Sequence, residues 1–280
     1  INSFSGILNG TTNYILTKLF KDNLSFNEVL SIAKSKGFTS DAESELDIGG
    51  LDSAHKLTIL STICFGSSIN FSNNDIKGIS EISITDIVAV DKLGYKIKLI
   101  SEAYISDNQI YCTTEPKLIH KKNPLANVDG VLNAINLETD QLKSLFLEGE
   151  GAGGRATASS VISDLYEITS KTNILSLGFK TSSLINYKKF NTLETKSPYY
   201  LRIMTKDISG VLSKITGHFQ DFDISIEKIF QNPDSKADVH IPIIIFTHSI
   251  KKNKLIKAVN LIEKQPFVLE KIVIISINLN

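Results

Sequence analysis

Two ionisable side chains spaced four residues apart are the strongest candidates for chemistry in this 280-residue sequence. Asp52 and Lys56 fall in the first turns of an expected helix over residues 50–65, where positions i and i+4 share one face. A lysine that is held by a carboxylate can pass a proton to or from the oxygen of a bound substrate. The pair therefore predicts acid–base chemistry on an oxygen-bearing substrate.

More carboxylates precede this helix, in a segment that we expect to be a loop. The four acidic residues of this segment are Asp41, Glu43, Glu45 and Asp47. Carboxylates in a loop can bind an ammonium group through charge-assisted hydrogen bonds. Together with the acid–base pair, they predict an amino-acid substrate.

The same residues also have a purely structural interpretation. Most Asp–Lys pairs at i and i+4 are solvated surface pairs, and they stabilise a helix by roughly 0.3–0.5 kcal/mol. His55 is more typical of a surface or core histidine than of a ligand, because no second histidine or cysteine lies at metal-binding spacing. We therefore expect no transition-metal site.

A glycine run at residues 149–154 matches the pattern G-x-G-x-x-G, after an expected strand at 145–147 and before an expected helix at 157–171. No acidic residue ends a strand about 20 residues later, and no strand–helix alternation surrounds the run. We therefore expect an exposed backbone turn at a helix N-terminus, which a cofactor can approach closely, and not a complete dinucleotide-binding unit.

The periodicity of residues 1–180 predicts an α+β domain, in which a mixed sheet is flanked by helices. A strand at 3–9 leads to a turn at Asn9-Gly10, and Thr11 is expected to cap the next helix. Ser25 opens a second helix with a capping-box pattern. A helix at 84–93 precedes β-rich runs at 96–105, 109–116, 130–138 and 143–149. The polar residues 181–197 predict a linker.

Residues 198–280 show a different order of elements. Strands at 199–204, 225–231, 239–247 and 268–277 and helices at 210–219 and 252–263 predict the ferredoxin-like β-α-β-β-α-β arrangement. In its first strand-to-helix turn, Gly210 and a free helix N-terminus could meet a ligand carboxylate or a partner subunit. A purely structural role of Gly210 in the turn is the alternative.

Charge and hydropathy argue against several classes of protein. Thirty basic and 30 acidic side chains leave no net charge to attract nucleic acid or an anionic membrane. The longest apolar runs, such as 241–246 and 272–277, are far shorter than the roughly 20 residues of a membrane helix. Cys64 and Cys112 lie in apolar stretches without C-x-x-C spacing, which predicts reduced core cysteines and a cytoplasmic location.

Four blocks of sequence together resemble the homoserine dehydrogenase family, and they cover essentially the whole chain. Residues 6–16 (GILNGTTNYIL) are similar to the family's entry into its catalytic domain, and residues 46–56 (LDIGGLDSAHK) to its catalytic helix. Residues 127–134 with 149–158 resemble the sheet and glycine turn that follow. Residues 199–212 resemble the start of the ACT regulatory domain that many members carry.

The resemblance implies NAD(P)-dependent interconversion of L-aspartate 4-semialdehyde and L-homoserine, in threonine and methionine biosynthesis, with NADP or NAD as the cofactor. It implies that Lys56 donates the proton to the carbonyl oxygen and that Asp52 positions both substrate and lysine. The implied substrate contacts are Gly10, Thr11, Phe38 and Asp47. The implied cofactor contacts are Gly37, Gly151 and Gly153. A threonine effector is implied at Asp207, Gly210, Val211 and Leu212.

The sequence departs from the family pattern in two places. Phe38 stands where the family usually has tyrosine, and the segment between Gly37 and Asp47 is one residue longer than usual. The carboxylate that binds the substrate ammonium therefore has two candidates, Asp41 first and Glu43 second.

The larger difference concerns the family's segment before Ile1. The glycine-rich strand–turn–helix, a second catalytic lysine and a cation site precede the position where this sequence begins. We therefore expect residues 1–280 to lack most of the NAD(P)-binding domain and to have no useful activity alone. The resemblance also implies a homodimer, or alternatively a homotetramer.

Two other functions stay open at this point. One is a non-catalytic amino-acid-binding module whose ACT domain senses threonine, which would stabilise the chain in a concentration-dependent way. The other is a different dehydrogenase that uses the glycine run as its own nucleotide site. That function would require this chain to bind NADPH by itself.

Overall fold

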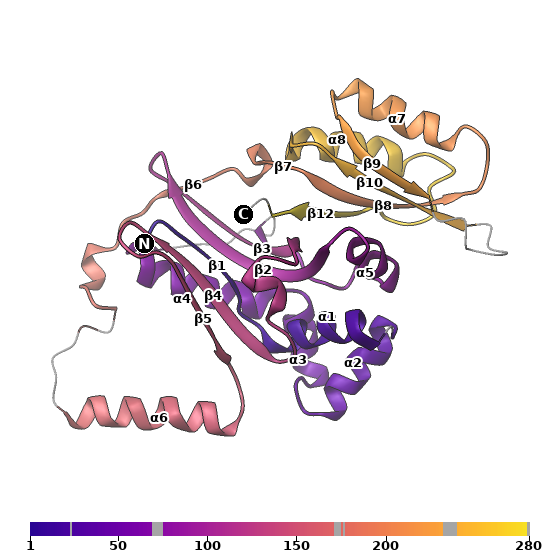
Figure 1. Ribbon diagram of the computed structural model, residues 1–280. Helices are drawn as coiled ribbons and strands as arrows, with labels where there is room; N and C mark the ends of the chain where they lie inside the picture. The colour runs from indigo at the N-terminus through magenta and orange to yellow at the C-terminus, as the bar shows by residue number, and fades with distance from the viewer. Residues whose placement is uncertain (23, 69–74, 171–174, 176, 232–239, 279–280) are drawn as a thin grey trace. The chain divides into compact units, whose positions relative to one another are not determined.

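A computed structural model describes residues 1–22, 24–68, 75–170, 175, 177–231 and 240–278 (Figure 1). The fold is α+β, as predicted, and the chain divides into two compact units. The first unit contains residues 1–84, 97–116 and 121–190, and the second contains residues 85–96, 117–120 and 191–280. The strands β2 (Tyr95–Ser106) and β3 (Gln109–His120) contribute residues to both units.

The first unit is built on a mixed sheet, as predicted, with the strand order β5-β4-β1-β2-β3. The strand β1 (Ser3–Ile7) runs antiparallel to both of its neighbours, β2 and β4 (Leu132–Thr139). β5 (Lys143–Glu150) forms a hairpin with β4, and β6 (Lys188–Lys189) pairs with β3 in parallel.

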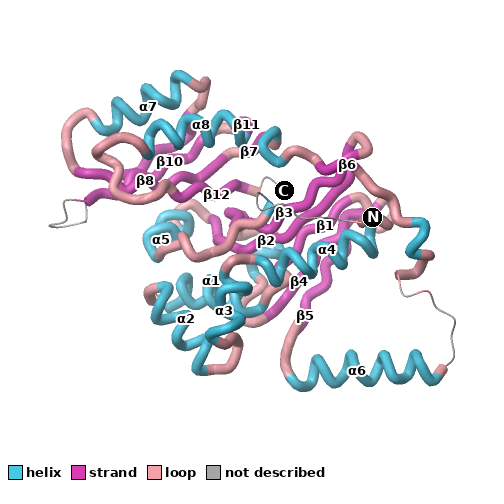
Figure 2. The backbone as a smooth tube through the Cα atoms, turned by 180° about the vertical axis from the view of Figure 1, so that it is seen from behind, coloured by secondary structure: helices cyan, strands magenta, loops and turns pink. Residues whose placement is uncertain are grey.

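Helix α4 (Leu51–Phe65) packs on this sheet (Figure 2). Its Leu57 is fully buried in a cluster whose other buried members come from β1, the residue after it, β2 and β3: Phe4, Leu8, Ala103, Ile110 and Cys112. Burying an aliphatic or aromatic side chain of this size stabilises the fold by roughly 1.5–3 kcal/mol. The cluster therefore holds α4 firmly, and its first turns present Asp52 and Lys56.

Helix α1 (Gly10–Asp22) begins earlier than the sequence predicts. Asn9, and not Thr11, is its cap, because the Asn9 Oδ1 accepts a hydrogen bond of 2.8 Å from the Thr12 N–H. An amide oxygen is among the best N-cap acceptors, which explains why α1 starts here.

Helix α2 (Phe26–Ser35) has the predicted capping box, in which the Glu28 carboxylate accepts a hydrogen bond from the Ser25 N–H at 2.8 Å.

The acidic segment predicted as a loop is a helix, α3 (Asp41–Ile48). Ser40 caps it by accepting a hydrogen bond from the Glu43 N–H, and the Ser40 hydroxyl donates to the Glu43 carboxylate at 2.9 Å. Carboxylates in the first turn of a helix are stabilised by the positive end of its dipole. The loop prediction was therefore wrong, because Ser40 caps a helix here and two of the four acidic residues, Asp41 and Glu43, lie in its first turn.

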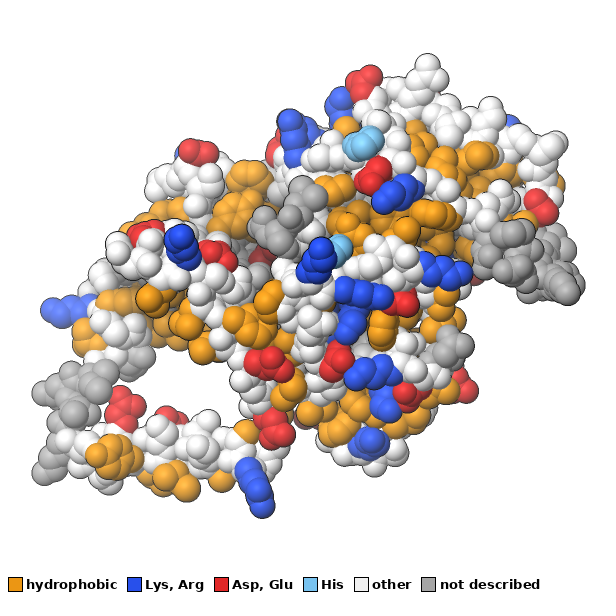
Figure 3. Space-filling model, viewed as in Figure 1, with side chains coloured by type: hydrophobic (Ala, Val, Ile, Leu, Met, Phe, Trp, Pro, Cys, Tyr) orange, Lys and Arg blue, Asp and Glu red, His pale blue; other side chains and the backbone are white. Residues whose placement is uncertain are grey.

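Helix α6 (Gly154–Thr169) begins before the predicted residue 157 and buries none of its side chains. Figure 3 shows apolar side chains along it in orange. Its exposed large apolar residues are Val161, Ile162, Leu165, Tyr166 and Ile168. Residue 171, the last residue of the predicted helix, lies outside the described residues.

The predicted linker contains several short elements. They are the 3-10 turns η3 (Thr181–Ser183) and η4 (Thr192–Glu194) and the strands β6 and β7 (Lys196–Ser197). β7 pairs with β11 (Ile250–Lys251). A further 3-10 turn, η2 (Pro124–Asn127), precedes β4.

The second unit follows the predicted order of elements. Its elements are β8 (Tyr199–Lys206), α7 (Val211–Asp221), β9 (Ile226–Gln231), β10 (His240–Thr247), α8 (Lys252–Glu263) and β12 (Val273–Ile277). The strands lie in the order β12-β8-β10-β9, and each neighbouring pair is antiparallel. Residue 239 of the third predicted strand lies outside the described residues. The last strand starts at Val273 and not at Val268, which forms only an isolated bridge to Thr205.

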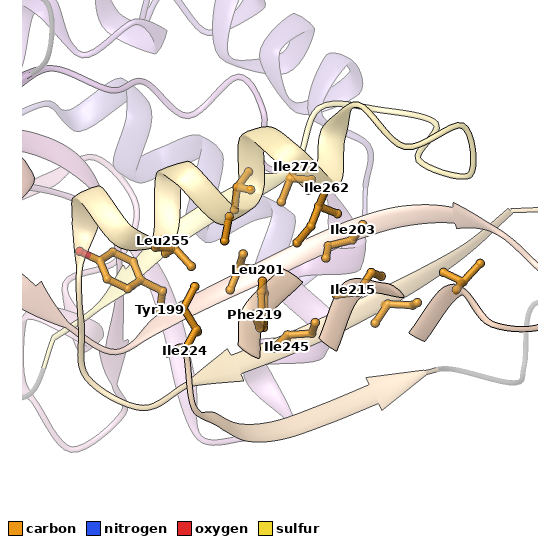
Figure 4. Close-up of a cluster of buried hydrophobic side chains, with 14 of the residues drawn as sticks. Tyr199, Leu201, Ile203, Ile215, Phe219, Ile224, Ile245, Leu255, Ile262 and Ile272 are labelled. Carbon is orange, nitrogen blue, oxygen red and sulfur yellow. The ribbon is translucent and has the colours of Figure 1, made fainter. Parts of the chain in front are cut away.

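The core of the second unit lies between this sheet and the helices α7 and α8. Figure 4 shows Leu201 and Ile203 of β8 facing Phe219 of α7 and Leu255 of α8. A short helix, α5 (Ile84–Asp91), also joins this unit, because its buried Asp86 accepts a hydrogen bond of 2.7 Å from the Tyr200 hydroxyl. No helix among the described residues is long and apolar enough to cross a bilayer.

Candidate active site

The predicted acid–base pair is formed on the first two turns of α4. The Lys56 Nζ donates a hydrogen bond of 2.7 Å to the Asp52 Oδ2 and another of 3.1 Å to the backbone carbonyl of Leu8. The side chains of Lys56 and Asp52 are 44% and 32% exposed, so both are reachable from solvent. An ammonium group has three N–H bonds, and no other partner of this one is present among the described residues. One donor is therefore open to a substrate oxygen.

Asn9 links this pair to a second aspartate. Its Nδ2 donates a hydrogen bond of 2.8 Å to the Asp52 Oδ2 and another of 2.7 Å to the Asp47 Oδ1. The other oxygen of Asp47 accepts a hydrogen bond of 2.8 Å from the Thr39 hydroxyl. Three segments of the first unit therefore meet at one polar cluster: the residue that caps α1, the end of α3 and the start of α4.

Two glycines make the turn that brings Asp47 and Asp52 together. Asp47 lies at the end of α3 and Asp52 at the start of α4, with Gly49 as the C-cap of α3 and Gly50 as the N-cap of α4. Gly50 has a φ of +84°, which residues with a Cβ rarely adopt. The turn therefore depends on glycine at this position.

The start of α1 lies beside the cluster and is held from two sides. The Thr11 hydroxyl donates a hydrogen bond of 2.8 Å to the Phe38 carbonyl, and the Phe38 ring contacts Tyr14 edge-on at 4.8 Å between centroids. A Cβ on Gly10 would lie 2.7 Å from the Val131 carbonyl oxygen. Gly10 is therefore required by a close backbone approach.

The glycine turn at residues 149–154 joins the end of β5 to α6. A Cβ on Gly151 would overlap the side-chain amide of Asn133, and Asn133 follows closely after Val131, the residue that contacts Gly10. Gly153 has a φ of +114° and Gly37 has a φ of +72°, and a Cβ added at either position would have no neighbouring atom within 4 Å. Bare backbone of this kind can be approached closely by a ligand.

Two predicted site residues lie apart from the cluster. The Asp41 side chain is 95% exposed and accepts a hydrogen bond of 2.7 Å from Lys34 on α2, which lowers the pKa of the Asp41 carboxyl below its ordinary value. Glu43 is exposed and accepts from the Ser40 hydroxyl. Hydrogen bonds connect Asp47, Asp52 and Lys56, whereas these two carboxylates have partners elsewhere.

The predicted effector turn belongs to the second unit. Gly210 caps α7 with a φ of +86° and, having no side chain, gives no cap hydrogen bond to the first turn of this helix. Asp207 and Leu212 are exposed, and Val211 is buried under the helix.

Among the described residues, no group of three or more histidine, cysteine, aspartate or glutamate side chains could hold a metal ion.

Sequence reasoning missed Asn9 and Thr39, although both touch the predicted aspartates. The position of Asn9 could have been predicted, because asparagine immediately before a helix is a favoured N-cap and its side chain then has a defined place. The pattern Ser40-x-x-Glu43 was likewise a usable signal for α3. Thr39 carried none, since its contact with Asp47 depends on how α3 folds.

Comparisons with known proteins identify the family of this chain. Residues 1–166 match the family described as homoserine dehydrogenase. The homoserine dehydrogenase of Helicobacter pylori is 36% identical over 270 residues, which are 96% of this chain and 63% of that protein. That of Methanocaldococcus jannaschii is 42% identical over 172 residues, 61% of this chain and 49% of that protein.

A solved structure of a homoserine dehydrogenase from Thiobacillus denitrificans matches with a TM-score of 0.84 and 32% identity, covering 99% of this chain and 64% of that one. The chain thus spans less than two thirds of the length of these relatives. The family match covers more than half of the chain, and the predicted acid–base pair lies within it. This chain therefore belongs to the homoserine dehydrogenase family.

Proposed function

We propose that this chain carries the substrate-binding and proton-transfer site of an NAD(P)-dependent oxidoreductase that interconverts L-aspartate 4-semialdehyde and L-homoserine. The observation that supports this most strongly is the Lys56 ammonium, which is held by Asp52 and the Leu8 carbonyl with one N–H bond left over. A lysine oriented in this way can act as a general acid at a carbonyl oxygen.

In the direction of reduction, Lys56 donates a proton to the substrate oxygen as that oxygen gains negative charge. The carboxylate of Asp52 stabilises the charged ammonium beforehand and keeps it aimed at one place. In the direction of oxidation, the neutral amine takes the proton back from the hydroxyl group. A bound nicotinamide dinucleotide would supply or accept the hydride at the neighbouring carbon.

Substrate binding is assigned to the residues around this lysine. The Asp52 Oδ1 has no partner among the described residues, and Asp47 lies beside it, so the two carboxylates can attract the substrate ammonium. Gly10, Thr11 and Phe38 would form the adjoining wall. Asp41 would reach the ammonium only by leaving Lys34, which makes it, and its alternative Glu43, the weaker candidates.

We assign the dinucleotide to the backbone at Gly37, Gly151 and Gly153. Gly37 and Gly153 have open space where a Cβ would be, and Gly151 packs against the side-chain amide of Asn133. A hyperthermophilic archaeal homoserine dehydrogenase mutant has been solved in complex with NADPH, with a TM-score of 0.50 and 29% identity to this chain. The proposed cofactor is therefore NADP or NAD.

We assign residues 1–180 to the catalytic and dimerisation domain, residues 181–197 to a linker and residues 198–280 to an ACT regulatory domain. The β-α-β-β-α-β order with strand order β12-β8-β10-β9 supports this assignment, since it is the ferredoxin-like arrangement.

Threonine is the proposed effector of the ACT domain, at Asp207, Gly210, Val211 and Leu212. A homodimer or homotetramer in the cytoplasm completes the proposal, and the two free cysteines fit a reducing compartment.

The test is an assay of the complete natural polypeptide that contains these residues. We expect it to oxidise NADPH or NADH when aspartate 4-semialdehyde is added and to reduce NADP or NAD with homoserine. Turnover of other short aldehydes at the same rate would contradict the proposed substrate. A complete absence of turnover, together with stabilisation by threonine, would favour the amino-acid-binding module instead.

A further inference from the structure

We propose that Asn9 is a positioning residue of this active site, which holds the carboxylates of Asp47 and Asp52 side by side and sets which oxygen of Asp52 faces the substrate. The inference rests on the proposed function and deepens it. It follows from the contacts of a single side-chain amide.

Both N–H bonds of the Asn9 amide are used, one for each aspartate, at 2.7 and 2.8 Å. Two oxygens bonded to one nitrogen at such distances lie within about 5.5 Å of each other. Two carboxylates this close repel each other when both are ionised, and each charge-assisted hydrogen bond from a neutral donor offsets part of that repulsion. Asn9 can therefore keep two negative charges together without adding a positive charge that would compete with Lys56.

The orientation of the Asn9 amide is determined by its other contacts. Its Oδ1 accepts a hydrogen bond of 2.8 Å from the Thr12 N–H, which can only donate, and its Nδ2 faces carboxylates, which can accept. The residue is 4% exposed, and its backbone carbonyl accepts from the Thr12 hydroxyl at 3.0 Å and from the Asn13 N–H at 3.3 Å. The start of α1 thus holds the amide in place.

This arrangement decides how Asp52 is presented. Its Oδ2 accepts from both Asn9 and Lys56, whereas its Oδ1 has no partner among the residues that the structure describes. Loss of the Asn9 donors would let the Asp52 carboxylate rotate, and the carboxylates of Asp47 and Asp52 would no longer be held side by side. The catalytic lysine would then lose its fixed direction as well.

The test uses Asn9→Asp in the complete natural polypeptide. Aspartate keeps an oxygen that can accept from the Thr12 N–H, so the helix cap is retained, but it removes both donors. Asn9→Ser is the second variant, which keeps a cap without adding a charge. Asn136→Asp is the matched control, because Asn136 on β4 also donates to a carboxylate, that of Glu138, at 2.9 Å, away from the Asn9 cluster.

We expect both Asn9 variants to lower kcat/KM for homoserine, the aspartate variant by about 100-fold, because small errors in the position of catalytic groups are costly. KM for homoserine should rise as well, because Asp47 and Asp52 would no longer be held side by side to bind the substrate ammonium. Asn136→Asp should leave both kcat and KM unchanged. Wild-type values of kcat and KM in both Asn9 variants would overturn the proposal.

A second measurement separates this proposal from the proposed function. The 13C resonances of the Asp47 and Asp52 carboxyl groups can be compared by NMR between the wild type and Asn9→Ser at one pH, without any turnover. If the wild type does not act on homoserine, the proposed function fails, and this comparison still decides the role of Asn9. Changed 13C chemical shifts of both carboxyl groups in Asn9→Ser would support positioning by Asn9, and unchanged shifts would overturn it.

Discussion

The Asp52 carboxylate accepts a hydrogen bond of 2.7 Å from the Lys56 ammonium, one turn further along α4. Lys18 and Asp22 on α1 form a pair with the same spacing and the same 2.7 Å distance. The difference lies in the partners, because only the first pair also contacts the Leu8 carbonyl and the Asn9 amide. Long-range contacts, and not the spacing, distinguish the candidate site from an ordinary surface pair.

Replacing Lys56 by alanine should remove the proton donor. We expect kcat/KM for aspartate 4-semialdehyde to fall by about 1000-fold, in the range usual for loss of a general acid. The thermal unfolding midpoint should stay close to that of the wild type, since a partly exposed ion pair stabilises a protein by at most about 1 kcal/mol. Steady-state kinetics and a melting curve measure the two effects.

Lys18→Ala is the matched control for this substitution, because it breaks a pair with the same spacing and the same distance on another helix, where the lysine precedes the aspartate. Its kcat/KM should equal that of the wild type. Equal losses in the two variants would mean that Lys56 acts only through the helix and not on the substrate.

The two candidate sites for the substrate ammonium can be separated by their KM values. Asp47→Asn should raise KM for homoserine by about 10-fold or more, because it removes a negative charge beside Asp52. Asp41→Asn should change KM by less than about 3-fold, because this exposed carboxylate binds Lys34. A larger effect at Asp41 would show that the carboxylate leaves Lys34 when substrate binds.

A buried charge cluster should control the stability of the second unit. Asp86 is fully buried and accepts hydrogen bonds from the Tyr200 hydroxyl at 2.7 Å and from the Arg202 Nε at 2.8 Å. We expect Asp86→Ala to lower the free energy of unfolding in urea by about 3 kcal/mol, because Arg202 would keep a buried charge without this partner. Asp221→Ala, on the surface of α7, should cost under about 0.5 kcal/mol, and similar losses for both would refute this account.

The Cys112 thiol should make stability depend on alkaline pH. Burial raises the pKa of Cys112 from 9.0 to about 12, while a weak hydrogen bond with Ser61 opposes part of the increase. Between these values the unfolded chain releases the proton and the folded chain keeps it, so stability falls as the pH rises from about 9. In Cys112→Ala, the free energy of unfolding measured with urea should fall less steeply between about pH 9 and 11 than in the wild type. Parallel curves of this free energy against pH would contradict the prediction.

Threonine should stabilise the chain if the second unit is a regulatory domain. We expect the melting temperature to rise with threonine concentration, since a ligand that binds only the folded state stabilises it by mass action. Gly210→Val should abolish this increase, because a φ of +86° is strained for a β-branched residue at the proposed effector turn. D-threonine is the control ligand, and equal stabilisation by both enantiomers would argue against a specific site.

Much of this protein could be predicted from the sequence alone. The helical spacing of Asp52 and Lys56, the capping box at Ser25, the β-α-β-β-α-β order after residue 198 and the family resemblance all depend on local patterns or on short motifs. Such patterns can be interpreted without knowledge of the fold, because the helix and strand periods determine which side chains share a face. The predicted α4 and the second unit accordingly agree with the structure.

The tertiary structure decided how the site is assembled. Asn9 is 38 residues from Asp47 and 43 from Asp52, and one amide group contacts both. No local pattern contains that contact, because it depends on α4 packing on the sheet and on the Gly49-Gly50 turn between α3 and α4. The same packing left Asp41 outside the cluster, paired with Lys34. Spacing along the chain was therefore sufficient to predict the acid–base pair, whereas packing between distant segments determined its hydrogen-bond partners.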